Sequence, residues 1–162
     1  MNYNNLAQKT NYIAGSDKLP KLPFYLTTVN IPGINFSHPE IGGRYGSRLN
    51  VVGDSITYNE LSFEMLVDEN FEIYHEFMDK VVHNINPESG TFAPIEFDFW
   101  IQINNNKGNK LFKINFTNCR ISSLDDIILD SQDDITEYIM SVSIRYDYYT
   151  IEKNIVPTLR TS

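Results

Sequence analysis

The sharpest pattern of apolar and polar positions runs over residues 53–84, where the hydrophobic period changes once. The first half alternates between apolar and polar side chains, which predicts a strand with one buried face. The second half repeats at helical spacing, which predicts an amphipathic helix. The apolar positions of the expected strand are Leu61, Phe63, Met65 and Val67, and those of the expected helix are Phe71, Tyr74, Phe77, Met78, Val81 and Val82.

Asp68 lies where the period changes. Its side chain can accept a hydrogen bond from a backbone N–H that the first helical turn leaves without a partner, so we expect it to be the N-cap. Glu76 and Lys80 are four residues apart and are expected to form an ion pair along the helix. We expect this helix to be the only long one and to cover one side of a β core.

Residues 95–103 and 110–118 alternate in the same way. The polar segment 104–109 joins them and contains Gly108, which can adopt a positive φ, so the two segments predict a long hairpin. Residues 136–151 also alternate along their whole length and predict a long last strand.

Residues 24–30 predict an early strand, because they are rich in β-forming side chains, and Pro20 and Pro23 are expected to stop any helix before it. The expected fold is therefore mainly β with one long helix: an antiparallel β-sandwich or small barrel with the helix packed beside it. We expect an N-terminal arm over residues 1–20, one domain over 21–152 and a C-terminal tail over 153–162.

The chain has 162 residues, a net charge of −8 and one cysteine, Cys119. The acidic balance argues against a surface that binds nucleic acid, because phosphate binding needs a basic patch. No signal-peptide pattern and no apolar run of about 20 residues is present, so we expect a soluble, intracellularly made protein without a membrane partner.

Residues with catalytic or metal-binding chemistry are scattered rather than grouped. The histidines lack metal-ligand spacing, Cys119 lacks a partner motif, and the acidic segment 130–134 departs from a calcium-loop pattern. We therefore expect no catalytic residue, no cofactor and no metal. The histidines in question are His38, His75 and His83.

The function is therefore expected to depend on surface contacts, and two functional hypotheses other than catalysis stay open. Long β edges need pairing or protection, so self-assembly is the first reading. A carbohydrate-binding β-sandwich that stacks sugars on Trp100 and exposed tyrosines such as Tyr25 and Tyr149 is the second. A hydrolase that uses Asp98 with another carboxylate, for example Glu96, is a third and weaker one.

The order of elements resembles a known family. N-I-P-G-I over residues 30–34 is followed by V-G-D-x-I-T-Y-x-E-L-x-F-E-M-L-V-D-E over 52–69, then by the helix, the hairpin, C-R-I-S-S-L-D-D-I over 119–127 and the last strand. This sequence resembles the tail-tube family of contractile-tailed bacteriophages, including the related tube-end proteins. That family shares its fold with the tube protein of type VI secretion. The resemblance covers about residues 22–152.

The resemblance implies a virion structural protein of the tail, made in the host cytoplasm. It implies a hexameric ring that stacks into a tube, a shared β-barrel around a channel for DNA ejection, and sheath, baseplate or neck proteins as partners. DNA would pass without specific binding, repelled by an acidic lumen. The hairpin face expected to line the lumen carries Glu96, Asp98, Gln102, Lys113 and Asn115.

The resemblance also implies that the N-terminal arm and the loop around residues 42–48 reach adjacent subunits or rings. The residues expected at these subunit interfaces are Tyr3, Tyr12, Arg44, Tyr45 and Arg48. The polar arm and the polar C-terminal tail exceed what a plain repeating tube subunit needs. A tube-end protein, either a terminator or a baseplate-proximal initiator, is therefore the alternative within the same family.

Overall fold

The computed structural model describes residues 9–37, 40–42, 48–50, 53, 55–83, 95–129 and 137–153. Antiparallel β-structure dominates this part of the chain, as the sequence predicts. The elements are β1 (Tyr12–Ser16), α1 (Leu22–Tyr25), β2 (Leu26–Val29), β3 (Ile34–Phe36), β4 (Glu40–Gly42), β5 (Arg48–Asn50), β6 (Ile56–Tyr58), β7 (Leu61–Leu66), α2 (Glu72–His83), β8 (Phe97–Asn104), β9 (Lys110–Leu124), β10 (Ile139–Arg145) and β11 (Tyr148–Lys153).

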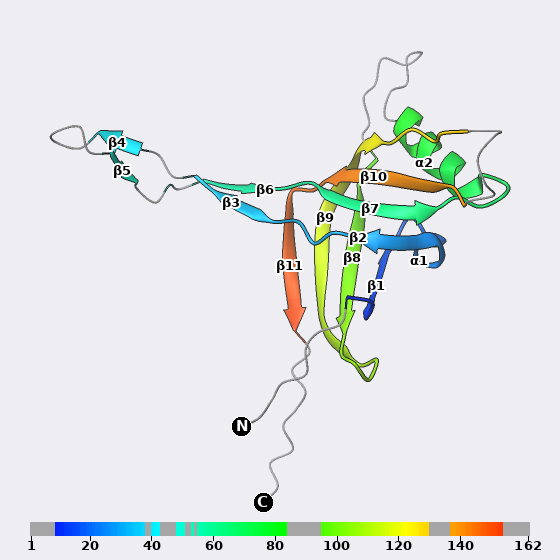
Figure 1. The fold of residues 1–162 in the computed structure, drawn as a ribbon, viewed down its shortest axis with the longest axis horizontal. Helices are drawn as coiled ribbons and strands as arrows, with labels where there is room; N and C mark the ends of the chain where they lie inside the picture. The colour runs from blue at the N-terminus through cyan, green and yellow to red at the C-terminus, as the bar shows by residue number, and fades with distance from the viewer. Residues whose placement is uncertain are drawn as a thin grey trace, which may run out of the picture.

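The main sheet has seven strands and bends at β9. Its order is β1-β8-β9-β10-β7-β2, and β11 pairs with β9 beside this path. Residues 112–117 of β9 pair with β8 and β11, whereas residues 120–124 of the same strand pair with β10. The strands on the two sides of the bend cross steeply in Figure 1, so β9 belongs to two layers.

The core lies between these two layers. Phe63 of β7 and Phe99 of β8 face each other with ring centroids 5.4 Å apart, and Phe77 of α2 lies 6.2 Å from Phe63. All three side chains are buried. The alternating pattern of β7 and β8 thus supplies one core face from each layer, because period-two alternation sends every second side chain inward.

Asp68 caps the helix as expected but from further away than an N-cap residue, because α2 begins at Glu72 and Phe71, expected to be helical, precedes it with a φ of 55°. The Asp68 carboxylate accepts hydrogen bonds from the backbone N–H groups of Glu72 and Ile73, both at 3.1 Å, and these bonds lower the pKa of the carboxyl. Lys80 Nζ lies 3.2 Å from Glu76 Oε1, which is the predicted ion pair. Among the described residues, neither helix has the length and apolar character that crossing a bilayer requires.

Two segments differ from the expectations. Residues 12–16, assigned above to the N-terminal arm, form β1 instead. They pair antiparallel with β8, with Tyr12 opposite Ile103. Residues 22–25 form the short helix α1 rather than the start of a strand, with Pro23 in its first turn. Proline is tolerated there because the first turn leaves its N–H positions unpaired.

The expected last strand is divided into β10 and β11 at Tyr146 and Asp147. β10 pairs with β7 and β9, whereas β11 pairs with the other part of β9. The alternation changes phase at this corner. Met140, Val142 and Ile144 face the core in β10, whereas Tyr149 and Ile151 pair with the buried Phe116 and Ile114 in β11. Tyr148, expected on the same face as Met140, is therefore exposed, and the doublet Tyr148-Tyr149 marks the change in the sequence.

Candidate assembly surface

The face of β1, β8, β9 and β11 that points away from the core presents half-buried and exposed side chains on four neighbouring strands. The four strands align in rows, and two of these rows point outward. We call this surface the outer face. Its outward rows are Ile13, Gln102, Lys113 and Glu152, and Gly15, Trp100, Asn115 and Thr150.

Three of the residues expected to line a channel lie together on the outer face. Gln102 is paired with Lys113, and Trp100 with Asn115. Lys113 Nζ lies 4.6 Å from the centroid of the Trp100 ring, a cation–π contact. One face of Trp100 is therefore occupied, which leaves less of the ring for stacking against a sugar.

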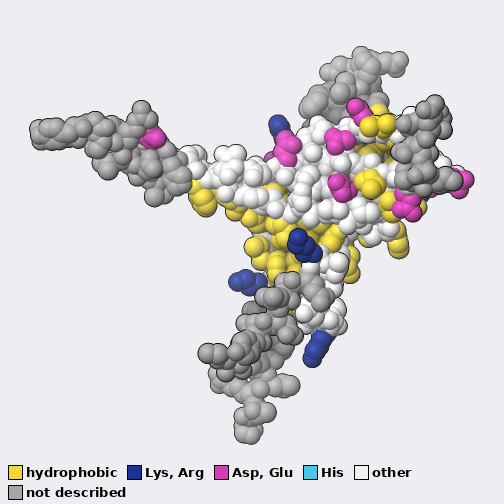
Figure 2. Space-filling view, viewed as in Figure 1, with side chains coloured by type: hydrophobic (Ala, Val, Ile, Leu, Met, Phe, Trp, Pro, Cys, Tyr) yellow, Lys and Arg dark blue, Asp and Glu magenta, His cyan; other side chains and the backbone are white. Residues whose placement is uncertain are grey.

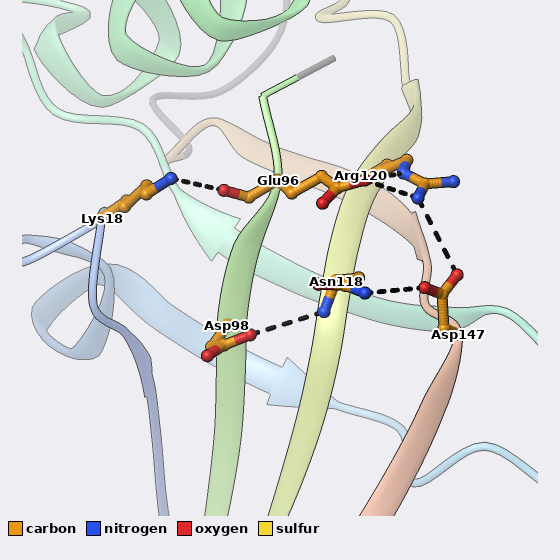
Figure 3. A network of polar contacts seen from close by, with 6 residues as sticks. All are labelled: Lys18, Glu96, Asp98, Asn118, Arg120 and Asp147. Atoms are coloured by element: carbon orange, nitrogen blue, oxygen red, sulfur yellow. Dashed lines mark hydrogen bonds and ion pairs between the residues drawn. The ribbon is translucent and has the colours of Figure 1, made fainter.

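The other two, Glu96 and Asp98, lie at the corner where β9 leaves β8. Figure 3 shows them in a polar network with Lys18, Asn118, Arg120 and Asp147. The guanidinium of Arg120 donates to Glu96 Oε1 from Nε at 3.0 Å and from its terminal nitrogen at 2.5 Å. These hydrogen bonds, and next the charge of Glu96, raise the pKa of Arg120.

Asp98 is exposed and lies beside a β-bulge. The register shifts between Phe97 and Phe99, so Asp98 faces two residues of β9, and Asn118 takes a φ of 55° there. Asp98 Oδ1 accepts a hydrogen bond from the Asn118 N–H at 3.4 Å, and Asn118 Nδ2 donates to Asp147 at 2.8 Å. Bulges of this kind bend a strand, and here the carboxylates support the bend.

Cations and carboxylates are interspersed on the outer face and at its corner. Lys113 and Glu152 share one row, and Glu96 is paired with Arg120 at the corner. Whether Glu96 and Asp98 line an acidic channel stays a prediction.

The residues expected at subunit interfaces are only partly described. Tyr12 lies in β1 and its hydroxyl donates to the carbonyl of Thr27 at 2.8 Å, within the same chain. Arg48 lies at the start of β5, opposite Gly42. Tyr3, Arg44 and Tyr45 lie outside the described residues.

A second surface was missed by the sequence reading. β3 and β6 form a two-stranded ribbon that projects from the body beside β11 (Figure 1). Its cross-strand pairs, Ile34 with Tyr58 and Phe36 with Ile56, share one face, and all four side chains are exposed. The alternation in I-N-F and I-T-Y was the available signal, but each segment is too short to stand out.

The cavity against α2, which described residues line, holds no catalytic grouping. It has a volume of about 480 Å³ and is lined chiefly by Phe71, Tyr74, Met78 and the segment 124–129. Within the described part of the chain, no three His, Cys, Asp or Glu side chains come close enough to hold a metal ion. The acidic segment 130–134 lies outside that part.

Solved structures with the same fold come from contractile injection systems. A chain in the tube-terminating cap of the anti-feeding prophage superposes with a TM-score of 0.69 at 16% identity, covering 94% of this chain and 95% of that one. The chain has the contractile tube fold.

Two further structures carry the tube fold. A chain in the PVC sheath–tube complex in its extended state, from an extracellular contractile injection system, has a TM-score of 0.65 at 14% identity, with 91% and 92% of the two chains covered. A chain in the PVC sheath/tube terminator in its extended state has a TM-score of 0.66 at 13% identity, with 92% of this chain and 98% of that chain covered. No protein-family model matches the sequence, and no curated protein sequence matches it significantly. The resemblance to the tail-tube family is thus confirmed at the level of the fold.

Proposed function

We propose that this protein is a structural ring subunit of the tube of a contractile tail or injection system, with a role that involves no bond-making. One observation carries the proposal. Strand direction alternates across β1, β8, β9 and β11, and β11 ends this layer with most of its residues exposed. Copies related by rotation would set β11 of one beside the β1 side of the next, in antiparallel orientation.

The outer face would then line a channel. We propose six copies to a ring, the number implied by the tail-tube family, and stacking of rings into a tube. In this arrangement the layer of β7, β10 and α2 lies outside the wall, where sheath proteins would contact it. The cargo would pass without specific binding, and in a bacteriophage tail that cargo would be DNA.

The position along the tube has two candidates. A repeating tube subunit stacks on both ring faces, whereas a terminator or initiator stacks on one and meets a neck or baseplate protein on the other. The fold is similar to that of a chain in a tube-terminating cap and to that of a chain in a sheath–tube complex, so both positions remain candidates. Either position would place the protein in the tail of a virion or an injection particle.

Electron microscopy of the purified protein tests the ring and the position together. Negatively stained rings with a central channel are the expected result. Long tubes would identify a repeating subunit, and single or paired rings a tube-end protein. A protein that stays monomeric at high concentration, alone and with a baseplate extract, contradicts the ring.

Disulfide cross-linking tests which edges meet. Ile13 and the outer-face residues of β11 are suitable positions, so the variants are Ile13→Cys combined with Thr150→Cys or with Glu152→Cys. Two strands separate β1 from β11, a spacing of about 14 Å, so the bond cannot form within one chain. A ladder of covalent oligomers is expected on oxidation.

The parent protein is the control for this cross-linking. Its thiol, Cys119, is buried, and burial raises the pKa of that thiol to about 12, which disfavours the reactive thiolate. No ladder should form from Cys119 alone. Rings that form without any ladder from either double variant would show that other edges meet.

A further inference from the structure

We propose that Phe24 of one copy docks into an apolar corner of the next copy, between the ribbon β3/β6 and strand β11. The inference rests on the proposed ring and names the side chains that join its subunits. We define the apolar corner by Ile34, Phe36, Ile56, Tyr58 and Ile151.

Within the described part of the chain, the apolar face of the ribbon is largely exposed. Phe36 is 55% exposed and its cross-strand partner Ile56 is 52% exposed. An isolated two-stranded ribbon is marginal in water, and an exposed apolar face on it adds a further cost. Contact with another surface would remove both costs.

Strand β11 shows that the corner is open on its inner side as well. Ile151 shares a row with Ala14, Ile101 and Ile114, which are 2%, 0% and 3% exposed, yet Ile151 is 53% exposed. The core layer therefore ends before the last strand of the row. An inward-facing apolar side chain at a sheet edge needs a neighbour that continues the layer.

The two exposed parts belong to one surface. The Tyr58 ring lies 5.6 Å from that of Tyr149 in β11 and 5.9 Å from that of Tyr146. The apolar face of the ribbon is thus turned toward β11, and Figure 2 shows hydrophobic side chains along the lower side of the ribbon and onward toward β11. The hydroxyl of Tyr146 is buried in this cluster without a hydrogen-bond partner.

Phe24 lies at the opposite side of the molecule. It belongs to α1, which adjoins β1, and it is 84% exposed while its neighbour Leu22 is buried. Pro23 packs close to Gly15, where an added Cβ would come within 3.1 Å of its ring. Figure 1 places α1 beyond β1 at one side and the ribbon beyond β11 at the other, so Phe24 cannot reach the corner of its own chain.

Charges at the two edges support the same neighbour. Charged side chains of alternating sign cross the sheet in the network of Figure 3, in the order Lys18, Glu96, Arg120 and Asp147. Lys18 donates to the main-chain carbonyl of Glu96, whereas Arg120 pairs with the carboxylates of Glu96 and Asp147. The network begins beside β1 with a cation and ends beside β11 with an anion. A second copy set against β11 brings its own Lys18 toward Asp147 and continues the alternation.

This contact joins unlike surfaces, the α1 side of one copy and the ribbon side of the next. Heterologous contacts of this kind generate closed rings when the rotation between copies closes. The occupant of the corner is therefore a second copy of this chain.

Phe24→Ala is the direct test. Phe24 is exposed in the single chain, so the monomer should fold as before, with unchanged near-ultraviolet circular dichroism and thermal midpoint. The protein concentration at half-assembly, measured by sedimentation velocity, should rise at least about tenfold, because the variant no longer buries a phenyl ring between subunits. Ile128→Ala is the matched control, since Ile128 is 81% exposed and lies outside the corner.

A cross-link gives the second readout. Phe24→Cys with Phe36→Cys should give a covalent ladder in assembled protein and none in monomers. Rings that assemble normally with Phe24→Ala and give no ladder would overturn the docking and leave the ring intact. A parent protein that forms no ring overturns both.

Discussion

The rings of Phe63 and Phe99 stack with an interplanar angle of 9° and centroids 5.4 Å apart. Phe63 belongs to β7 and Phe99 to β8, so this contact joins the two layers of the bent sheet. Phe116 of β9 lies 6.2 Å from Phe99 and continues the aromatic packing toward the strand that both layers share.

Phe99→Ala is expected to lower the free energy of unfolding by about 3–5 kcal/mol, because the lost ring leaves a cavity between the layers. Urea unfolding below the assembly concentration measures the change. Phe24→Ala is the matched control, and its change should stay within about 0.5 kcal/mol. Equal effects of the two variants would contradict the assignment of Phe99 to the core.

The β-bulge at Asn118 predicts different tolerance for two substitutions. Its φ of 55° suits glycine and is costly for a β-branched side chain. Asn118→Val should therefore be less stable than Asn118→Gly by about 1–3 kcal/mol in urea unfolding. Both variants lose the hydrogen bond to Asp147, so their difference isolates the backbone strain.

Alkaline pH should destabilise the fold through Tyr146. Burial, with smaller contributions from Tyr149 and Tyr58, raises the pKa of the Tyr146 hydroxyl from 10.0 to about 12. A raised pKa means that its contribution to stability is complete below pH 10.0 and is lost as the pH rises toward about 12. Burial also raises the pKa of the Cys119 thiol from 9.0 to about 12, so the loss of stability that it causes begins at a lower pH, near 9.0.

Tyr146→Phe tests this assignment. The free energy of unfolding at pH 7 should stay the same or rise by about 1 kcal/mol, because the buried hydroxyl has no partner. The fall in stability above pH 10 should be shallower than in the parent. Tyr148→Phe removes an exposed hydroxyl and serves as the control. A steeper fall in Tyr146→Phe would show that the hydroxyl stabilises the fold.

Trp100 reports whether the outer face stays wet in the assembled ring. It is the one tryptophan of the chain, and it lies half-buried on that face. If the face lines a channel, acrylamide should quench its fluorescence equally in monomers and rings. A loss of quenching on assembly would show that the face packs against another subunit.

A tryptophan moved to the proposed interface gives the opposite expectation. In Trp100→Phe combined with Phe24→Trp, quenching should fall when rings form, because the indole enters the apolar corner. The two measurements together separate the channel side of a subunit from its contact side.

Local patterns were enough to predict the elements with strong periodicity. The strand and helix on either side of Asp68, the Glu76–Lys80 ion pair and the hairpin of β8 and β9 all depend on residues within a few positions of one another. The hydrogen-bond and charge rules that govern them act at the same range, so one sequence suffices.

Features that depend on distant pairing could not be predicted in the same way. β1 has five residues, and its partner Ile103 lies far along the chain from Tyr12. Alternation placed Glu96 and Asp98 on an exposed face but could not show that Arg120 and the Asn118 N–H would meet them there. The corner between β10 and β11 was missed because its signal is a single doublet, Tyr148-Tyr149, where the alternation changes phase.

Strand β9 runs through both layers without a break. A load applied to the layer of β7 and β10 therefore reaches the layer of β8 and β11 along the covalent backbone of β9. Side-chain contacts such as that of Phe63 with Phe99 then have to resist only sliding of one layer over the other. Pulling on such a subunit would stretch one polypeptide before it could peel its two layers apart.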